Sequence, residues 1–243
     1  MTAGRIFSRN EIIVVSSNTL FHFTKKYATL LAILKSKGFW PKYCVEEGWQ
    51  DQFAVPESCF CDIPLSGILP HIKKYGSYGL GMSKVWGKEK GLSPVLYYLK
   101  GSGLAKEVNK LLGTYKKDAR QCRSMRFLAY VKVYGIKRES DGGVVETFYN
   151  EREWRYVPSG VNKVVTFDCS RKNLEKLSEE SREHMQMCKF NYGDVKYIIV
   201  DTENERETLL NDIRKMVGQE APEDEIRLLC SKIVTCDFIK EDI

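Results

Sequence analysis

One stretch of the 243-residue sequence, Phe148–Pro158, most constrains the fold, because two glutamates alternate there with arginines and aromatic residues. In an extended chain, side chains alternate between two faces, so Glu151, Glu153 and Arg155 would share one face. Two carboxylates would then point into one space beside a guanidinium, and we expect Arg155 to pair with them and keep both ionised. Trp154 would lie on the other face, in the core. The plainer interpretation is an edge strand with a solvated charged face.

Composition limits the class of protein. Hydrophobic residues make up 43% and charged residues 29% of the sequence, as in ordinary soluble proteins. Apolar runs stay well short of the roughly 20 residues that cross a bilayer, so we expect no membrane contact. Met1–Asn10 lacks the apolar core of a secretory signal, and we expect a cytoplasmic protein whose eight cysteines are thiols. Cys59 and Cys61 lack a nearby histidine to complete a zinc site, and we expect no metal.

The spacing of strands and helices predicts an α+β fold. Short strands mixed with helices at irregular intervals favour one domain over residues 11–243, after a flexible terminus at residues 1–10. Thr24 is predicted to cap a helix over Lys25–Lys37, and the hairpin turn Asp141–Gly143 leads into the charged stretch. Further strands are predicted over Thr19–Thr24, Phe127–Ile136, Val164–Phe167, Val195–Val200 and Lys232–Phe238.

Three segments together resemble a known family. Leu20–Thr24 with the helix that follows it, Val55–Trp86 and Phe148–Pro158 resemble the AbiGi family of abortive-infection proteins, labelled as the antitoxin of a phage-resistance pair. More remotely, the order of a His-Phe-Thr strand, a strand-helix-Tyr segment and a late Glu-x-Glu is similar to DarT-type ADP-ribosyltransferases, which modify nucleic acid. That remote resemblance implies an ADP-ribosyltransferase-like split mixed β-sheet and NAD+ as substrate.

The remote resemblance also implies roles for individual residues. Glu153 would stabilise the oxocarbenium-like ribose as nicotinamide leaves, and Glu151 would orient or deprotonate the acceptor, with the reverse order also open. Cys59 and Cys61 depart from the family pattern, because they stand where a Ser-x-Ser strand is expected. A core histidine and plain aromatic packing are the alternatives for the cofactor contacts. Those contacts are assigned to His22, Phe23, Thr24, Tyr75 or Tyr78, and Arg155.

Charge is unevenly distributed along the chain. Lys100–Arg138 contains eleven Lys or Arg and two acids, a balance of +9, whereas residues 139–243 contain fifteen and twenty-three, a balance of −8. A basic segment of this kind could contact nucleic-acid phosphates, although a solvated helix face is the commoner reason for one, and a docking surface for an acidic antitoxin is a further alternative. The residues predicted to hold RNA or single-stranded DNA are Lys116, Lys117, Arg120, Arg123 and Arg126.

Two functions from different classes are therefore open. The first is an NAD-dependent ADP-ribosyltransferase toxin of a bacterial anti-phage pair, which modifies nucleic acid and is neutralised by a cognate antitoxin. The second is a non-catalytic AbiGi-type antitoxin that neutralises a partner toxin. The paired glutamates and His22 favour the enzyme. The family label favours the antitoxin.

Overall fold

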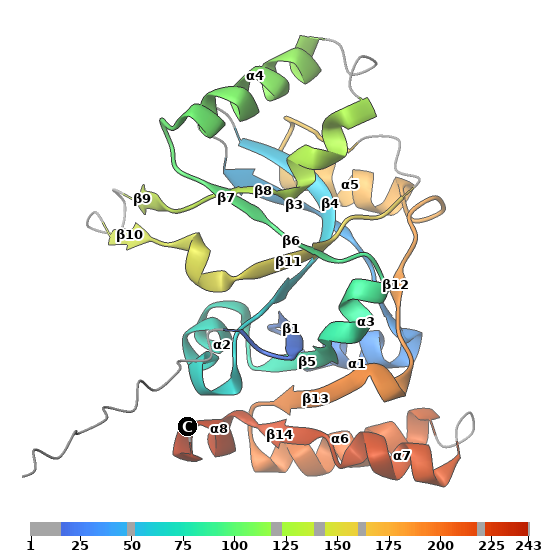
Figure 1. The fold of residues 1–243 in the computed structure, drawn as a ribbon. Coiled ribbons are helices and arrows are strands. Elements are labelled where there is room, and N and C mark those ends of the chain that lie inside the picture. The colour runs from blue at the N-terminus through green and yellow to red at the C-terminus, as the bar shows by residue number, and fades with distance from the viewer. Residues whose placement is uncertain are drawn as a thin grey trace, which may run out of the picture.

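The computed structural model describes residues 16–47, 52–117, 123–138, 144–159, 164–217 and 222–242. The predicted flexible terminus, the hairpin turn at Asp141–Gly143 and Arg120 lie outside the described residues. The fold is α+β, with several helices around a mixed sheet, as predicted (Figure 1).

One eight-stranded sheet organises the chain, in the order β14-β13-β5-β1-β4-β11-β6 with β3 also paired to β4. Strands β13 and β14 are parallel and the other pairs are antiparallel, so the sheet is mixed. The strands are β1 (Thr19–Thr24), β3 (Lys42–Glu47), β4 (Gln52–Cys61), β5 (Tyr78–Ser83), β6 (Ser93–Pro94), β11 (Glu153–Tyr156), β13 (Val195–Val200) and β14 (Ile233–Thr235).

The sheet divides between β1 and β4. Strand β1 pairs with β5 along its whole length, but with β4 through the single register pair Phe21↔Cys61. Further along, β4 pairs instead with β3, from Lys42↔Glu57 onward. Where β1 leaves β4, Nδ1 of His22 lies 2.8 Å from the carbonyl oxygen of Cys59. A carbonyl can only accept, so the imidazole donates this hydrogen bond and bridges the two strands.

Helices cover the sheet at both ends of the molecule. Figure 1 places α4 at one end with β3 and β4, and α6, α7 and α8 at the other beside β13 and β14. The helices are α1 (Tyr27–Ser36), α2 (Leu69–Tyr75), α3 (Lys84–Glu89), α4 (Gly103–Lys117), α5 (Arg171–Glu180), α6 (Glu203–Val217), α7 (Glu223–Cys230) and α8 (Cys236–Asp242). The 3₁₀ helices are η1 (Leu65–Gly67), η3 (Arg123–Tyr130), η5 (Phe148–Glu151) and η6 (Tyr192–Asp194).

Three short two-stranded sheets complete the fold of the described residues. They pair β2 (Gly38–Phe39) with β12 (Cys188–Lys189), β7 (Leu96–Tyr98) with β8 (Val131–Val133), and β9 (Ile136–Arg138) with β10 (Val144–Glu146). The antiparallel β9–β10 pair confirms the predicted hairpin.

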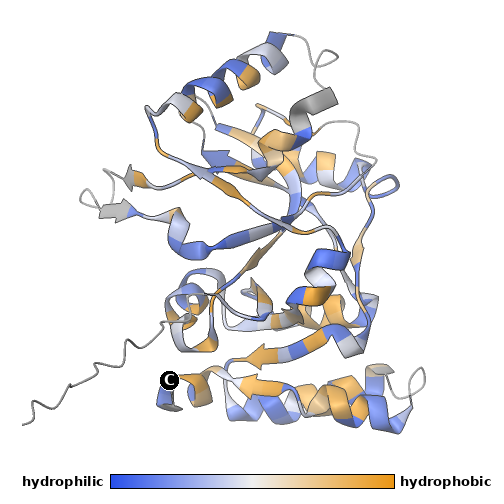
Figure 2. Cartoon of the chain, in the orientation of Figure 1, coloured by the Kyte–Doolittle hydropathy of each residue, from blue (hydrophilic) through white to orange (hydrophobic). Residues whose placement is uncertain are grey.

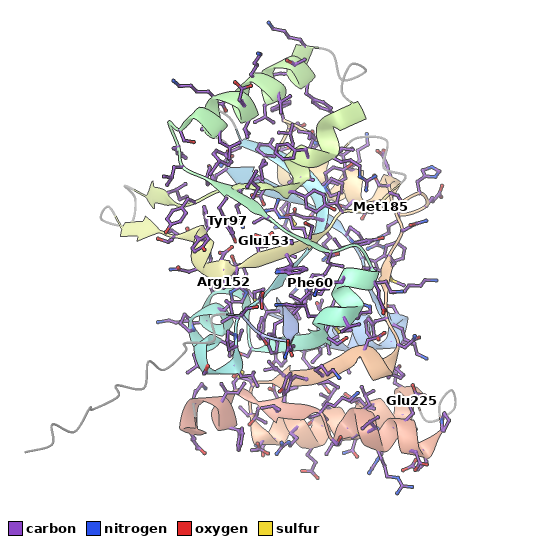
Figure 3. The ribbon with its side chains drawn as sticks, in the orientation of Figure 1. Phe60, Tyr97, Arg152, Glu153, Met185 and Glu225 are labelled. Atoms are coloured by element: carbon purple, nitrogen blue, oxygen red, sulfur yellow. The ribbon has the colours of Figure 1, made fainter. Side chains whose placement is uncertain are left out.

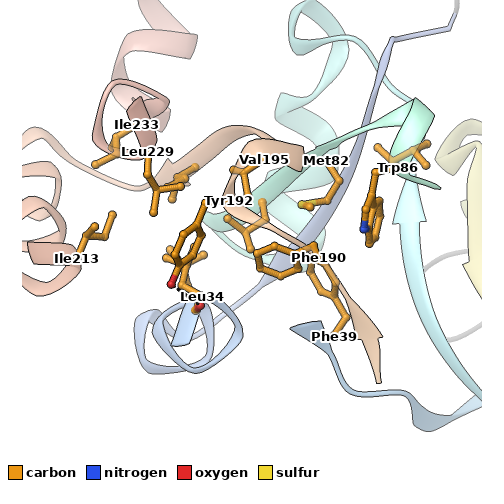
Figure 4. Close-up of a cluster of buried hydrophobic side chains, with 14 of the residues drawn as sticks. Leu34, Phe39, Met82, Trp86, Phe190, Tyr192, Val195, Ile213, Leu229 and Ile233 are labelled. Atoms are coloured by element: carbon orange, nitrogen blue, oxygen red, sulfur yellow. Dashed lines mark hydrogen bonds between the residues drawn. The ribbon is translucent and has the colours of Figure 1, made fainter. Parts of the chain in front are cut away.

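The largest core lies between the sheet and helices α1, α6 and α7 (Figure 4). The ring of Phe39 lies 5.9 Å from that of Trp86 and 5.4 Å from that of Phe190, and Leu34, Ile213 and Leu229 belong to the same core on α1, α6 and α7. A second core joins α4 to β8 and η5 through Val108, Leu112, Val131 and Phe148. The charged stretch lies between these cores, and Figure 2 shows η5 and β11 as hydrophilic ribbon in the middle of the molecule.

Some predicted elements are wrong at their ends. The first helix begins at Tyr27 after an N-cap at Lys26 that has no side-chain cap, so Thr24 does not cap it. The predicted strand Phe127–Ile136 is wrong in its first part, which belongs to η3, and correct at Val131–Val133, which forms β8.

Two other predicted strands are shorter than expected. Near Val164–Phe167 the structure has the single bridge Ala54↔Thr166. The predicted last strand stops at Thr235, whose hydroxyl accepts the amide of Phe238 at 3.2 Å and begins α8.

Candidate functional site

The two glutamates of the charged stretch do not lie on one strand. Glu151 ends η5, Arg152 takes a left-handed conformation with φ of 45°, and β11 begins at Glu153. The prediction that Glu151 and Glu153 share one face of a single strand is therefore wrong, because the left-handed residue Arg152 turns the chain between them. Both carboxylates nevertheless reach the same place, since the Nζ of Lys132 on β8 lies 3.0 Å from Glu151 and 2.5 Å from Glu153.

Arg155 is the centre of the buried charges and is fully inaccessible to solvent. Its Nε lies 2.5 Å from Glu153 and 3.0 Å from Glu57, and its Nη2 donates to Glu46 at 2.6 Å. Its Nη1 donates to the carbonyl oxygen of Ala129 at 2.8 Å. The predicted pairing of Arg155 is confirmed for Glu153 but not for Glu151, which pairs with Lys74 and Lys132, and the guanidinium is shared instead by Glu46 and Glu57 from β3 and β4.

These contacts keep Glu153 ionised. Burial alone would raise the pKa of Glu153, but the charges of Arg155 and Lys132 outweigh it and bring the pKa down to about 2. Figure 3 shows Glu153 beside Tyr97, whose hydroxyl accepts the Glu153 backbone amide at 2.9 Å. Burial would lower the pKa of Lys132, but Glu153 and the other nearby carboxylates raise it, so the ammonium stays charged.

Glu151 has its own set of partners. Its Oε1 accepts from Lys74 at 2.6 Å and from the hydroxyl of Tyr75, both on α2. Burial opposes ionisation, yet Lys132 and these donors lower the pKa of Glu151 below its ordinary value. Glu46 and Glu57 behave in the opposite way, because burial raises the pKa of each against the opposing charge of Arg155.

A cavity of about 260 Å³ lies where β1 leaves β4. It brings together residues from six parts of the chain, so the charged stretch, the first strand and the α2 segment meet as the sequence predicted. Its lining includes Phe21, His22 and Phe23 from β1, Cys44 and Glu46 from β3, Glu57, Cys59 and Cys61 from β4, His71 and Tyr75 from α2, and Lys132, Glu151 and Glu153.

Some of the predicted cofactor residues line the cavity, and others lie outside it. His22, Phe23 and Tyr75 line the cavity, whereas Tyr78 donates from its hydroxyl to Glu205 on α6 at 2.6 Å. Thr24 and Arg155 are not among the lining residues, and Arg155 is fully buried in its ion pairs. Burial lowers the pKa of His22, whose ring lies 5.0 Å from that of Phe39, so the imidazole is neutral and partly a core residue.

The predicted nucleic-acid residues do not form one described surface. Lys116 and Lys117 end α4 on its exposed side. Arg123 opens η3, and its side chain lies outside the described part. Arg126 instead donates to the backbone carbonyls of Val157 and Pro158, which fixes η3 against the segment after β11.

Sequence reasoning missed Lys132, Glu46, Glu57, Cys44 and His71. Lys132 was counted within the basic segment, but its place on β8 gives it a buried role. His71 lies against Tyr75 with ring centroids 4.4 Å apart, and burial lowers its pKa to about 4. No local pattern in the sequence signals the burial of Glu46 and Glu57, which follows from the pairing of β3 with β4.

Within the described residues, no helix is both long and apolar enough to cross a membrane.

The comparisons with known proteins give one family. The family model for the abortive phage resistance protein AbiGi, described as an antitoxin, matches residues 43–201. A protein of Lactococcus lactis subsp. cremoris named Abortive phage resistance protein AbiGi is 27% identical over 224 residues, covering 79% of this chain and 90% of the relative. No solved structure matches. The matched region contains the whole cluster around Arg155 but starts after β1 and its His22.

Proposed function

The chain belongs to the AbiGi family of abortive phage resistance proteins, and from this premise we propose that it is the antitoxin of a phage-resistance pair, neutralising a partner toxin by binding it. The observation that carries the proposal is Lys132, whose ammonium lies between Glu151 and Glu153. A transferase needs free negative charge beside the ribose, because positive charge develops on the sugar as nicotinamide leaves.

Both glutamates of the charged stretch are already paired with basic side chains of the protein itself. Glu153 is neutralised by Lys132 and Arg155, and Glu151 by Lys132 and Lys74. A cationic transition state would have to compete with an ammonium already 2.5 Å from Glu153. This arrangement suits a rigid internal support for β3, β4 and β11 better than a reaction centre.

Cavity size supports the same conclusion. The volume of about 260 Å³ is below the roughly 300 to 1,000 Å³ that enclose drug-sized ligands. A dinucleotide is larger than such ligands, so at most one end of it would enter while Lys132 holds its present place.

Complex formation tests the antitoxin proposal. Tagged chain, co-expressed with the toxin of its own pair, should retain that toxin through affinity purification and elute with it as one species in size-exclusion chromatography. A toxin from an unrelated pair is the control and should not be retained. The Glu151→Gln variant should keep the complex, because its cavity carboxylate has an internal role. Separate elution of two folded proteins would contradict the proposal.

A second candidate function, ADP-ribosyl transfer, is favoured by a different observation. His22, Tyr75, Glu151 and Glu153 come from segments far apart in the sequence and line one cavity at the division of the sheet. In this candidate the Lys132 ammonium swings out when NAD+ enters, Glu153 stabilises the ribose, and a nucleic-acid acceptor approaches past Glu151.

Labelled NAD+ separates the two candidates. The transferase candidate predicts that label appears on RNA or single-stranded DNA. The Glu153→Gln variant should lower the turnover number by a factor of about 10² to 10³. The Tyr78→Phe variant, which changes a tyrosine outside the cavity, should retain transfer. Folded wild-type protein that neither binds millimolar NAD+ in calorimetry nor labels any acceptor would eliminate this candidate.

A further inference from the structure

Two cysteines and a glutamate meet on one wall of the cavity. Cys44 lies on β3, and Glu57 and Cys59 lie on the neighbouring strand β4, with Cys44 opposite Val55 in the register. Residues two apart on a strand share a face, so Val55, Glu57 and Cys59 point the same way as Cys44. One potential ligand atom from each of Cys44, Glu57 and Cys59 lies within 4.8 Å of the other two.

We propose that Cys44, Glu57 and Cys59 form a binding site for a thiophilic divalent cation, Zn²⁺ in the first instance. Two cysteine sulfurs with one carboxylate oxygen are a donor set that zinc takes in proteins, whereas Mg²⁺ and Ca²⁺ prefer oxygen alone. Sulfur ligands of a tetrahedral zinc lie about 3.8 Å apart, given Zn–S bonds of about 2.3 Å. Small side-chain rotations are therefore enough to close the site.

The carboxylate is already held in the required orientation. Oε1 of Glu57 accepts from Sγ of Cys59 at 3.2 Å, so this oxygen faces the thiols. Its Oε2 lies 3.0 Å from Nε of Arg155. The ion pair with Arg155 holds this carboxylate beside the thiols, and Oε2 itself is buried without a hydrogen-bond partner among the described residues because the Nε–H of Arg155 donates to Glu153.

Charge balance also favours the cation. Metal binding releases the two thiol protons to water and replaces them with two positive charges, so the net charge of the buried cluster does not change. No unpaired charge is created in the interior, which would be costly. The fourth ligand position faces the cavity, where a water molecule or a small ligand completes the tetrahedron.

A second acidic group, Glu46, Glu57 and Glu153, has ligand atoms equally close together. The Arg155 guanidinium forms ion pairs with all three, so a cation already occupies that position. The thiol side of Glu57 is the side left for a metal. Sequence reasoning predicted no metal because Cys59 has no histidine nearby in the chain, and the pairing of β3 with β4 supplies Cys44 instead.

Metal content of the full chain tests the proposal without any assay of function. Reduced, metal-stripped protein should take up one equivalent of Zn²⁺, and Co²⁺ in its place should give a thiolate-to-cobalt charge-transfer band in the near ultraviolet. The Cys44→Ser/Cys59→Ser variant should lose both. Cys230→Ser is the matched control, since Cys230 is a half-buried thiol on α7, and it should keep both. No uptake by the folded wild type, or unchanged uptake by the double variant, would overturn the proposal.

Alkylation of the wild-type protein gives a second readout that needs no variant. Excess Zn²⁺ should slow the alkylation of Cys44 and Cys59 by iodoacetamide at least tenfold, as measured by peptide mass spectrometry. The alkylation rates of Cys169 and Cys230 should not change. Equal protection of all four thiols, or of none, would mean that Cys44 and Cys59 do not hold the metal. The proposal is independent of the antitoxin and transferase functions, because neither readout involves a toxin or NAD+.

Discussion

Removing the ammonium between the two glutamates should destabilise the fold by a predictable amount. Lys132→Met keeps the length of the side chain but leaves Glu151 and Glu153 without their shared partner. Breaking a buried ion pair typically costs about 3 to 5 kcal/mol of unfolding free energy. Arg155 still neutralises Glu153 and Lys74 still reaches Glu151, so we expect the lower end, about 3 kcal/mol. A protein of ordinary stability survives that loss.

The unfolding free energy that Lys132→Met loses relative to the wild type should depend on pH in a defined direction. The folded pKa of Glu153, about 2, is below its unfolded value of 4.5, so its stabilisation is present above pH 4.5 and is lost as the pH falls toward 2. The shift corresponds to about 3 kcal/mol, in line with the cost of breaking the pair. The variant lacks part of this stabilisation. The difference between wild type and variant should therefore be largest near pH 7 and smaller at pH 3.

Urea denaturation followed by tryptophan fluorescence measures both quantities. Lys74→Met is the matched control, because Lys74 pairs with the same Glu151 but its side chain is 40% exposed, against 13% for Lys132. We expect the control to cost less than about 1 kcal/mol. The account of the charge cluster is refuted if Lys132→Met costs no more than Lys74→Met at pH 7, or if its deficit is the same at pH 3.

Three further predictions concern other parts of the molecule. Gly76→Ala should lower the unfolding free energy by at least about 2 kcal/mol in the same denaturation assay, because Gly76 has φ of 118° and a Cβ would lie 2.3 Å from the Thr24 carbonyl oxygen; an unchanged midpoint would contradict this. His71 should remain neutral at pH 5.5 in an NMR titration, and its lowered pKa makes stability fall as the pH drops from 6.5 toward 4, by up to about 3 kcal/mol; titration near pH 6.5 would contradict the burial. Neutralising Lys116 and Lys117 together should weaken oligonucleotide binding and flatten its salt dependence if nucleic acid is the acceptor, and unchanged binding would remove α4 from that role.

The sequence predicted much of the site but neither the turn at Arg152 nor the buried ion pairs around Arg155. Periodicity and the resemblance together located His22, Tyr75, Glu151 and Glu153, and the fold brings these four around one cavity. Alternation alone could not reveal the left-handed Arg152, since a positive φ at a non-glycine residue depends on tertiary contacts, such as the bond from the Asp62 amide to its carbonyl oxygen.

The missed residues share a physical reason. Lys132, Glu46 and Glu57 are charged side chains in strands, and charged residues are normally predicted to be exposed. Their burial follows from pairing with Arg155 and with each other across β3, β4, β8 and β11, which no local pattern specifies. Strand pairing likewise brings Cys44 to Cys59. Tyr75 and Tyr78 are similar in sequence context, and they separate because β5 begins at Tyr78 and carries it toward α6.

Growth of cells that carry the inducible toxin of this chain's own phage-resistance pair tests the central claim most directly. The antitoxin account predicts that the toxin alone stops growth, that co-expression of this chain restores it, and that the chain expressed alone leaves both growth and cellular NAD+ unchanged. Growth arrest by the chain alone, with loss of NAD+ that Glu153→Gln prevents, would contradict the account and establish the transferase.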